Sequence, residues 1–208
     1  MTVSRSRPAC VARRRRAVKS LPVALFVADR GRTPDPVAVV RRLPAGVGVL
    51  YRDYARADRA AYAAMLARLC RAQRRVCLIA GDARLAGLVR AHGVHWPEGL
   101  IHRVDRRTGG LQTAAAHSVR AANQALARGA DAVLVSPVFA TRSHPGAGTL
   151  GPHRLARMLR FIQGPVYPLG GITAATARRL PPGLAGLAAI DAFAPTKAPL
   201  PCVGEGLG

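Results

Sequence analysis

The stretch QTAAAHSVRAANQALARGADAVLVS, residues 112–136, contains the pattern that decides the fold. The segment over 112–117 predicts a strand, and the spacing of apolar residues over 119–128 predicts a helix. The apolar run over 131–136 predicts a buried strand. Strands that are apolar along their whole length are typical of a parallel sheet covered on both faces, so this stretch predicts one β-α-β unit.

The same alternation continues in both directions along the chain. Further strands are expected at residues 23–28, 47–51, 76–80, 93–96, 166–169 and 187–190, and further helices at residues 36–43, 58–74, 83–92, 152–161 and 173–180. Eight strands in 208 residues fit a compact (β/α)8 TIM barrel, an architecture whose usual length is about 250 residues. An open doubly wound sheet is the alternative, but no GxGxxG motif follows the first expected strand. We therefore expect the barrel, with a Gly- and Arg-rich loop over 97–110.

Two tails are expected to flank a barrel domain over residues 21–193. Residues 1–20 carry seven basic and no acidic side chains and lack the apolar segment of a secretory signal, which favours a disordered basic extension over an Arg-rich transit peptide. Residues 194–208 contain three prolines and a Gly-rich end, so the eighth helix is expected to be absent or rudimentary. No apolar run approaches the ~18 residues of a membrane-spanning helix, and the four cysteines form no CxxC pair. We therefore expect a cytoplasmic protein.

Charge is the most unusual property of the composition. The formal net charge is +22, and all but two of the 32 basic residues are arginine, while a hydrophobic content of 50% excludes general disorder. Such a chain attracts phosphates and other polyanions. The arginines are scattered along expected helices, however, and the helix over 58–74 sets them opposite an apolar face of Tyr62, Met65, Leu66 and Leu69. Because stacking aromatic residues and known nucleic-acid-binding signatures are missing, a solvated basic surface is preferred to nucleic-acid recognition.

Polar side chains follow the expected strands at their carboxyl ends, where a barrel places its reactive groups. These ends carry Arg52 and Asp53, Gly81 and Asp82, His95 and Glu98, His117 and Ser118, Ser136 with the loop 139–151, and Gly170 with Gly171. The diglycine leaves backbone N–H groups that can hold a phosphate at the start of the following helix. We expect arginine, carboxylates, imidazoles and the diglycine to converge on one rim of the barrel.

The order of these segments resembles the thiamine phosphate synthase and thiazole tautomerase superfamily. The resemblance covers roughly residues 23–190 and is carried by VLYRDY (49–54), LIAGDARLA (78–86), GVHWPE (93–98), the stretch over 116–151, and the following PLGGI (168–172). It implies a (β/α)8 barrel, which agrees with the alternation. It also implies a Mg²⁺-assisted transferase that joins an aminopyrimidine diphosphate to a thiazole phosphate and releases pyrophosphate.

The resemblance implies roles for residues that follow the second and third strands. Arg52 matches the Arg that binds the pyrophosphate, whereas Tyr54 stands where a Lys is expected and Leu50 where a Gln is usual. Asp82 matches an Asp that binds Mg²⁺, with Gly81 in place of the neighbouring Asn. Arg52 and Asp82 are therefore expected to be catalytic residues, and Asp82 a metal ligand.

Further matches follow the later strands. Thr141 matches the family's Thr after the sixth strand, whereas His144 stands near the usual Lys; both are expected to bind substrate. Gly170, Gly171 and Ile172 match the segment that binds the thiazole phosphate. A second metal-binding Asp is usual after the fourth strand, but Leu100 falls near its position. Glu98 is the nearby carboxylate, and whether Glu98 or Arg142 compensates for the missing groups stays open.

Three candidate functions follow from these observations. The synthase ranks first, because Arg52, Asp82, Thr141 and the GGI segment occur together. A thiazole tautomerase is the second, in which His117 would move a proton on the ring by general acid–base catalysis. A non-catalytic relative that binds a phosphorylated ligand is the third, because a Lys, an Asn and an Asp of the family are missing. All three take small phosphorylated molecules and no membrane partner, and the oligomeric state stays open.

Structural roles compete with functional ones at several of these positions. Arg52 and Asp53 can form a rim ion pair, and Asp82 stands where it can cap the following helix. His95, beside Trp96, fits a structural histidine better than a catalyst.

Overall fold

One parallel sheet contains every strand in the described part of the chain, residues 20–54, 56–107, 109–141 and 148–193 of this computed structural model. Its strands are β1 (Ala24–Ala28), β2 (Val47–Tyr51), β3 (Cys77–Ala80), β4 (Gly93–Trp96), β5 (Leu111–Ala116), β6 (Ala132–Val135), β7 (Val166–Pro168) and β8 (Leu187–Ala189). They lie in the order β7-β6-β5-β4-β3-β2-β1-β8, and all hydrogen-bonded pairs are parallel. The two tails, apart from residue 20, and His144 lie outside the described residues.

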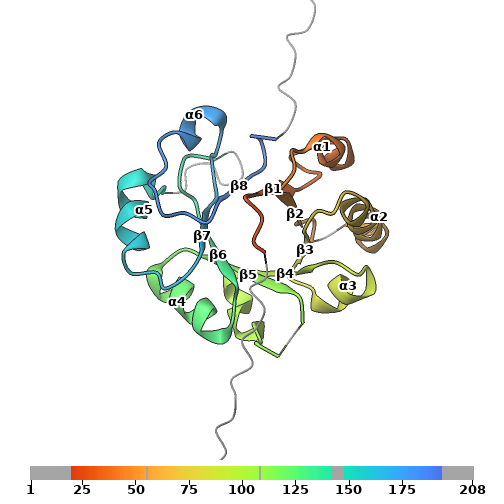
Figure 1. Cartoon of the computed structure of the whole chain (residues 1–208), viewed down its shortest axis with the longest axis horizontal. Coiled ribbons are helices and arrows are strands. Elements are labelled where there is room, and N and C mark those ends of the chain that lie inside the picture. The colour runs from red at the N-terminus through yellow and green to blue at the C-terminus, as the bar shows by residue number, and fades with distance from the viewer. Residues whose placement is uncertain (1–19, 55, 108, 142–147, 194–208) are drawn as a thin grey trace, which may run out of the picture.

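The sheet curls until its two edge strands approach each other (Figure 1). The N–H of Ala185, just before β8, donates to the carbonyl of Val166 on β7 at 3.0 Å. Inside the sheet, the buried Tyr167 hydroxyl of β7 donates to the carbonyl of Pro22, just before β1. These bonds draw β7 toward β8 and β1, and the result is the nearly closed TIM-like barrel that the sequence predicts.

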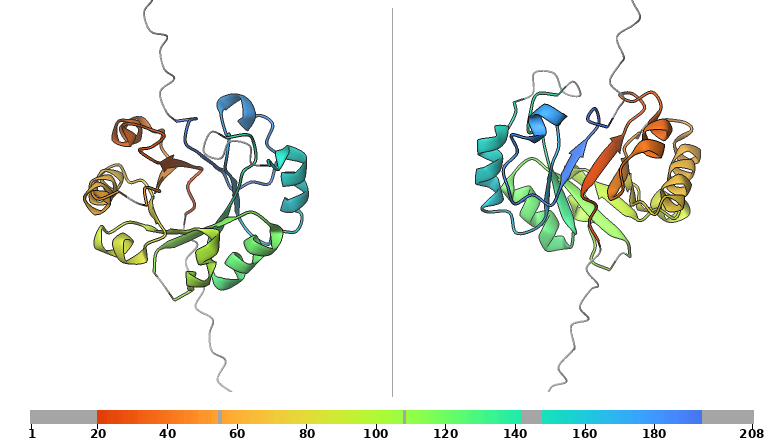
Figure 2. Two further views of the ribbon diagram at one scale, coloured as in Figure 1. Left: turned by 180° about the vertical axis from the view of Figure 1, so that it is seen from behind. Right: turned by 45° about the horizontal axis from the view of Figure 1, so that its top comes forward.

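Helices surround the strands on the outside (Figures 1 and 2). They are α1 (Pro36–Arg42), α2 (Arg59–Ala72), α3 (Ala83–Leu88), α4 (Val119–Arg128), α5 (Gly151–Leu159) and α6 (Ala174–Ala177). Helix α3 is shorter than predicted, because the chain leaves the helical conformation at Arg90, whose φ is 53°. None of the described helices is long and apolar enough to cross a membrane.

The connection between β4 and β5 corrects the sequence prediction. A loop was expected over 97–110, but the chain forms a 3₁₀ helix, η1 (Glu98–Arg103). Short 3₁₀ turns have no amphipathic period that sequence inspection could detect. Helix η1 matters for the site because it carries Glu98.

Apolar side chains alternate along each strand between two cores. Leu25, Val27 and Leu50 belong to a cluster inside the barrel, whereas Phe26 belongs to the cluster that packs under the helices. Burial on both faces explains why the strands are mostly apolar, with His95 on β4 and Gln112 and Thr113 on β5 as buried polar exceptions. On α2 the buried face differs from the predicted one, because Met65 is 38% exposed while Ala63, Leu66, Ala67 and Cys70 are buried.

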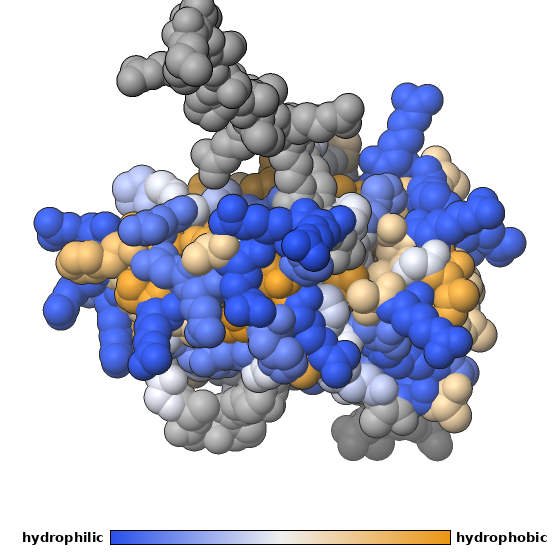
Figure 3. Space-filling model, turned by 90° about the horizontal axis from the view of Figure 1, so that it is seen from below, coloured by the Kyte–Doolittle hydropathy of each residue, from blue (hydrophilic) through white to orange (hydrophobic). Residues whose placement is uncertain are grey.

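Hydrophilic side chains cover most of the face drawn in Figure 3, with smaller apolar areas between them. This distribution fits the expected solvated surface.

One buried arginine holds the amino end of the barrel together. The Arg75 guanidinium donates to the carbonyls of Leu43, Pro44 and Val47 at 2.7–2.8 Å. Substituting Arg75→Met is expected to lower the free energy of unfolding by about 3 kcal/mol, because three carbonyls lose a buried donor. Urea denaturation measures this change. In the control Arg68→Met, an exposed position on α2, the change should stay within about 0.5 kcal/mol, and equal losses in both variants would contradict the assignment.

Candidate functional site

Two adjacent cavities lie at the carboxyl ends of the strands. The β6–β8 cavity has a volume of about 300 Å³, and the β1–β5 cavity a volume of about 910 Å³. The first is lined by Thr141, Gly170, Gly171, Ile172 and Asp191 among others, and the second by Asp29, Tyr54, Arg56, His95 and Glu98 among others. Both are lined by Arg32, Arg52, His117, Ser136 and Leu169. Two guanidinium groups and an imidazole therefore stand at the wall that the cavities share.

Arg52 reaches this wall from the end of β2. Its backbone N–H continues the ladder to the carbonyl of Ala28 at 3.0 Å, and its Nη2 donates to Oδ2 of Asp29 at 2.8 Å. The alternative role considered for Arg52, a rim ion pair with Asp53, is not what the structure shows, because Arg52 pairs with Asp29. Asp53 also lines the β1–β5 cavity, but its carboxylate is bonded to Arg30 and not to Arg52.

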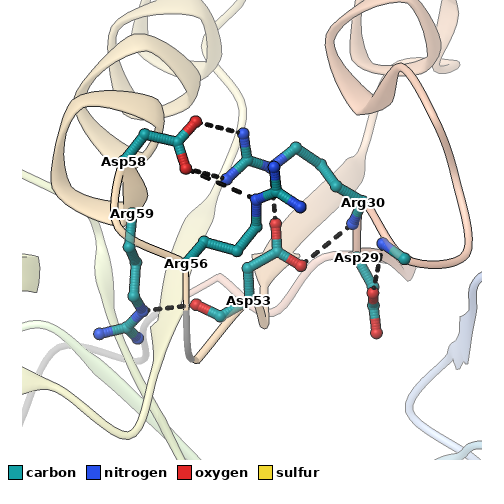
Figure 4. A network of polar contacts seen from close by, with 7 residues as sticks. Asp29, Arg30, Asp53, Arg56, Asp58 and Arg59 are labelled. Carbon is teal, nitrogen blue, oxygen red and sulfur yellow. Dashed lines mark hydrogen bonds and ion pairs between the residues drawn. The ribbon is translucent and has the colours of Figure 1, made fainter.

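Asp53 belongs instead to a network that ties β1 to α2 (Figure 4). The backbone N–H and Nε of Arg30 donate to the Asp53 carboxylate at 3.0 and 2.8 Å, and its Nη atoms donate to Asp58 at 2.6 and 2.7 Å. Hydrogen bonds from the Arg30 guanidinium hold the pKa of Asp58 well below its usual range. The same guanidinium lies 4.0 Å from the centre of the Tyr62 ring. This network fixes the segment that follows Arg52 against the loop after β1.

Asp82 caps helix α3. Its Oδ1 accepts the N–H of Leu85 at 2.8 Å, and its Oδ2 accepts from Nη1 of Arg59 at 3.2 Å. Arg59 also donates to the carbonyls of Asp53 and Ala80, both at 2.6 Å. Asp82 is not among the described residues that line either cavity. The structure thus brings Arg52, His117, Thr141 and the diglycine together around the β6–β8 cavity and leaves Asp82 outside the lining of both cavities.

Tyr54 and Gly81, both departures from the family's pattern, lie against each other. A Cβ atom built on Gly81 would come within 3.2 Å of Cε1 of Tyr54. The Tyr54 ring therefore occupies space that an Asn side chain at 81 would need. A phenol carries no positive charge at neutral pH, so this side of the β1–β5 cavity has a hydroxyl in place of an ammonium group.

The carboxylates near the cavities are the groups that would hold a metal ion in this region. Among the described residues, no three His, Cys, Asp or Glu side chains lie close enough to hold a metal ion by themselves. The Asp82 side chain is 38% exposed, and a carboxylate has about four acceptor positions, so its two hydrogen bonds leave room for a cation. Mg²⁺ commonly takes one or two carboxylates and completes its shell with water and substrate phosphates. These residues therefore fit Mg²⁺ only if a bound phosphate group supplies further oxygen ligands.

His117 presents one ring nitrogen as a hydrogen-bond acceptor. Its Nδ1 lies 2.6 Å from the carbonyl oxygen of Ser136, which can only accept, so the proton of the neutral ring is assigned to Nδ1. Its backbone N–H donates to Oε2 of Glu98 at 2.6 Å, and its Nε2 lies 3.9 Å from the same oxygen. The unprotonated Nε2 is thus suited to accept a proton at the shared wall.

His95 has a structural environment inside the barrel. Its Nδ1 lies 2.9 Å from Oγ1 of Thr113. Burial, with a smaller contribution from the charge of Arg52, lowers the pKa of His95 to about 3. The ring is therefore neutral where it lines the β1–β5 cavity, in agreement with the structural interpretation of this residue.

This buried imidazole predicts a pH dependence of stability. The unfolded chain binds a proton on His95 below about pH 6.5, whereas the folded protein does so only near pH 3, so the free energy of unfolding falls as the pH drops between these values. The slope contributed is at most about 1.4 kcal/mol per pH unit. Urea denaturation of His95→Asn should show a shallower slope from pH 6.5 to 4, whereas the exposed-site control His102→Asn should match the parent. An unchanged slope in His95→Asn would contradict this assignment.

The diglycine after β7 packs under the β6–α5 segment. Gly170 and Gly171 have φ angles of 98° and 64°, and a Cβ on Gly171 would overlap the carbonyl oxygen of Ala140 and come within 2.8 Å of Cβ of Phe139. In the described part of the chain, no acceptor takes the N–H of either glycine. Thr173, by contrast, caps α6, a single turn. Any anion held here would bind the glycine N–H groups rather than the helix.

Sequence comparisons place these features among known proteins. The sequence model described as "Thiamine monophosphate synthase" matches residues 24–193. A relative named "Putative thiamine-phosphate synthase 2" from Aquifex aeolicus is 38% identical over 94 residues, which span 43% of this chain and 50% of the relative. "Thiamine-phosphate synthase" from Thiobacillus denitrificans is 31% identical over 175 residues, 78% of this chain and 82% of the relative. The match thus covers only half the length of the Aquifex relative.

A solved structure supports the fold. Thiamine phosphate pyrophosphorylase from Pyrococcus furiosus superposes with a TM-score of 0.66 and 22% identity, over 82% of this chain and 86% of that one. At this identity the similarity establishes the barrel alone.

Proposed function

The chain belongs to the thiamine monophosphate synthase family, and we propose that it joins an aminopyrimidine diphosphate to a thiazole phosphate with release of pyrophosphate. The observation that carries this proposal is the pair of adjacent cavities with Arg32 and Arg52 at their shared wall. Two phosphorylated heterocycles that react with each other need two neighbouring compartments and cationic groups beside their phosphates. We further propose that the chain binds small phosphorylated molecules and is located in the cytoplasm.

The β1–β5 cavity is the proposed place of the aminopyrimidine diphosphate. As the bond between the pyrimidine methylene carbon and oxygen breaks, its electron pair stays with the leaving pyrophosphate, where negative charge builds. Arg52 stabilises that charge, whereas Arg56, which lines the same cavity, is 52% exposed, so that solvent screens its charge. The nitrogen lone pair of the thiazole then forms the new bond to the methylene carbon, so the step needs no proton transfer.

Asp82 is the proposed protein ligand of Mg²⁺, which when bound to the pyrophosphate would neutralise part of its charge. The capping bonds of Asp82 hold its carboxylate in place at the start of α3. Arg59 and the ring of Tyr54 pack nearby, with the guanidinium carbon 5.9 Å from the ring centre.

The β6–β8 cavity is the proposed place of the thiazole phosphate. The N–H groups of Gly170 and Gly171 suit phosphate oxygens, and Thr141 and Ile172 line the same compartment. Its volume of about 300 Å³ suits a single small ring.

A two-substrate assay tests this function. The purified full chain, given both substrates and Mg²⁺, should form thiamine phosphate and pyrophosphate in equal amounts. Absence of both products at high enzyme concentration would overturn the proposal.

The geometry of His117 favours a second candidate, a thiazole tautomerase. Its Nε2 is free of the proton that Nδ1 donates to Ser136, as a general base requires. Isomerisation of a thiazole phosphate that survives EDTA and disappears in His117→Asn would support this activity, whereas dependence on the diphosphate substrate and on Mg²⁺ would favour the synthase.

A further inference from the structure

A carboxylate lies in the cavity proposed for a phosphate. Asp191 follows β8 and lines the β6–β8 cavity together with Gly170 and Gly171. Two negative charges in so small a space repel each other strongly. A phosphate can bind beside Asp191 only if a cation compensates for this charge.

Arg32 is that cation. Its Nη2 lies 2.8 Å from Oδ2 of Asp191, and the side chains are 17% and 37% exposed. The strands β1 and β8 are neighbours in the barrel, which brings the loop after β1 beside the end of β8 (Figure 1). The N–H of Arg32 donates to the carbonyl of Asp29 at 3.0 Å, which fixes the loop. Arg32 thus stands at the shared wall while it neutralises Asp191.

A carboxylate and a phosphate differ in how strongly they bind the Arg32 guanidinium. An ion pair with a carboxylate that is more than a third exposed contributes little stability. A phosphate group carries more charge and accepts two parallel N–H bonds from a guanidinium. A phosphate that enters the cavity can therefore take the guanidinium from Asp191.

We propose that Arg32 is a phosphate-binding residue of the shared wall and that Asp191 is its built-in competitor. An incoming phosphoryl group displaces Asp191 from Arg32, whereas an uncharged ligand leaves the ion pair intact. Asp191 thus discriminates against ligands without a phosphate. The inference rests on the proposed function only for the identity of the natural ligand, because the ligand class, a phosphate monoester or diphosphate, follows from the guanidinium and glycine N–H groups.

Anion titrations test this assignment without catalysis. Isothermal titration calorimetry with inorganic phosphate, and separately with pyrophosphate, is carried out on the full chain and on Arg32→Gln, Asp191→Asn and the double variant. Arg32→Gln should weaken binding about tenfold or more, the scale of one charged hydrogen bond. Asp191→Asn should tighten binding several-fold, because the competitor is gone. In the double variant that gain should disappear, because it depends on Arg32.

Matched controls separate this coupling from a general effect of charge. Asp105→Asn and Arg160→Gln make the same charge changes at exposed positions, before β5 and after α5, away from both cavities. Both should bind phosphate within about twofold of the parent, because charges beyond a Debye length of ~10 Å are largely screened. Arg32→Lys, which keeps the charge without the planar fork, should give intermediate affinity, and thermal melts verify that each variant folds.

Two results would overturn the inference. One is an equal gain in phosphate affinity from Asp191→Asn in the parent and in Arg32→Gln. This result would show that Asp191 acts only through its general charge. The other is unchanged phosphate affinity in folded Arg32→Gln, which would make the ion pair purely structural. Failure of the two-substrate assay leaves these titrations interpretable, so the inference and the proposed function can fail separately.

Discussion

Arg52→Gln is expected to lower kcat/KM for thiamine phosphate formation by about 10²- to 10³-fold, the usual effect of removing one preorganised group that stabilises transition-state charge. The guanidinium is held at the shared wall by its 2.8 Å bond to Asp29, so it is in place before the leaving group develops its charge. Steady-state kinetics with both substrates measure the change. Because the ion pair is partly exposed, the free energy of unfolding should change by less than about 1 kcal/mol.

Arg56→Gln is the matched control for this prediction. Arg56 lines the same cavity, but its side chain is 52% exposed and lies 3.5 Å from Asp58. Solvent screens such a charge, so a loss below about tenfold is expected. Arg52→Lys should lie between parent and Arg52→Gln, because an ammonium group keeps the charge but loses bidentate geometry. Equal losses at 52 and 56 would contradict the special role of Arg52.

Asp82→Asn separates the two roles of Asp82. Asparagine caps helices about as well as aspartate, so α3 should stay intact and the melting temperature should barely change. The negative charge is lost, however, and an amide oxygen is a poorer Mg²⁺ ligand than a carboxylate. We expect kcat to fall by about 10²-fold and the Mg²⁺ concentration for half-maximal rate to rise.

Asp82→Ala completes the comparison. It removes both the cap and the charge, so it should lose similar activity and also about 1 kcal/mol of stability. If Asp82→Asn keeps full activity with the parent's Mg²⁺ dependence, Asp82 serves only as the cap that the structure displays.

The barrel was predictable because its signal is local. Most strands are apolar along their length, since one set of side chains fills the barrel and the alternate set packs under the helices. Helix η1 was not predictable in this way, because a 3₁₀ turn leaves no hydrophobic period. The buried face of α2 was misjudged at Met65, because its spacing from Leu69 suits a buried stripe, whereas smaller residues, Ala63 and Ala67, face the barrel.

Ion-pair partners within the site were harder to predict. The register of β1 on β2 pairs Ala28 with Tyr51, so the next residues, Asp29 and Arg52, lie side by side. This register could have been inferred once the strands were aligned. Arg32 and Asp191, by contrast, are 159 residues apart in sequence. Only the pairing of β8 with β1 brings these two residues together, and no local sequence pattern predicts that pairing.

A crystal structure of the full chain with thiamine phosphate and pyrophosphate bound tests the division of the site into two cavities. We expect the phosphate of thiamine phosphate to lie against the N–H groups of Gly170 and Gly171, and pyrophosphate to lie within hydrogen-bond distance of Arg52. Products bound with both phosphate groups in one cavity, or outside both, would contradict the division of the site at the Arg32–Arg52 wall.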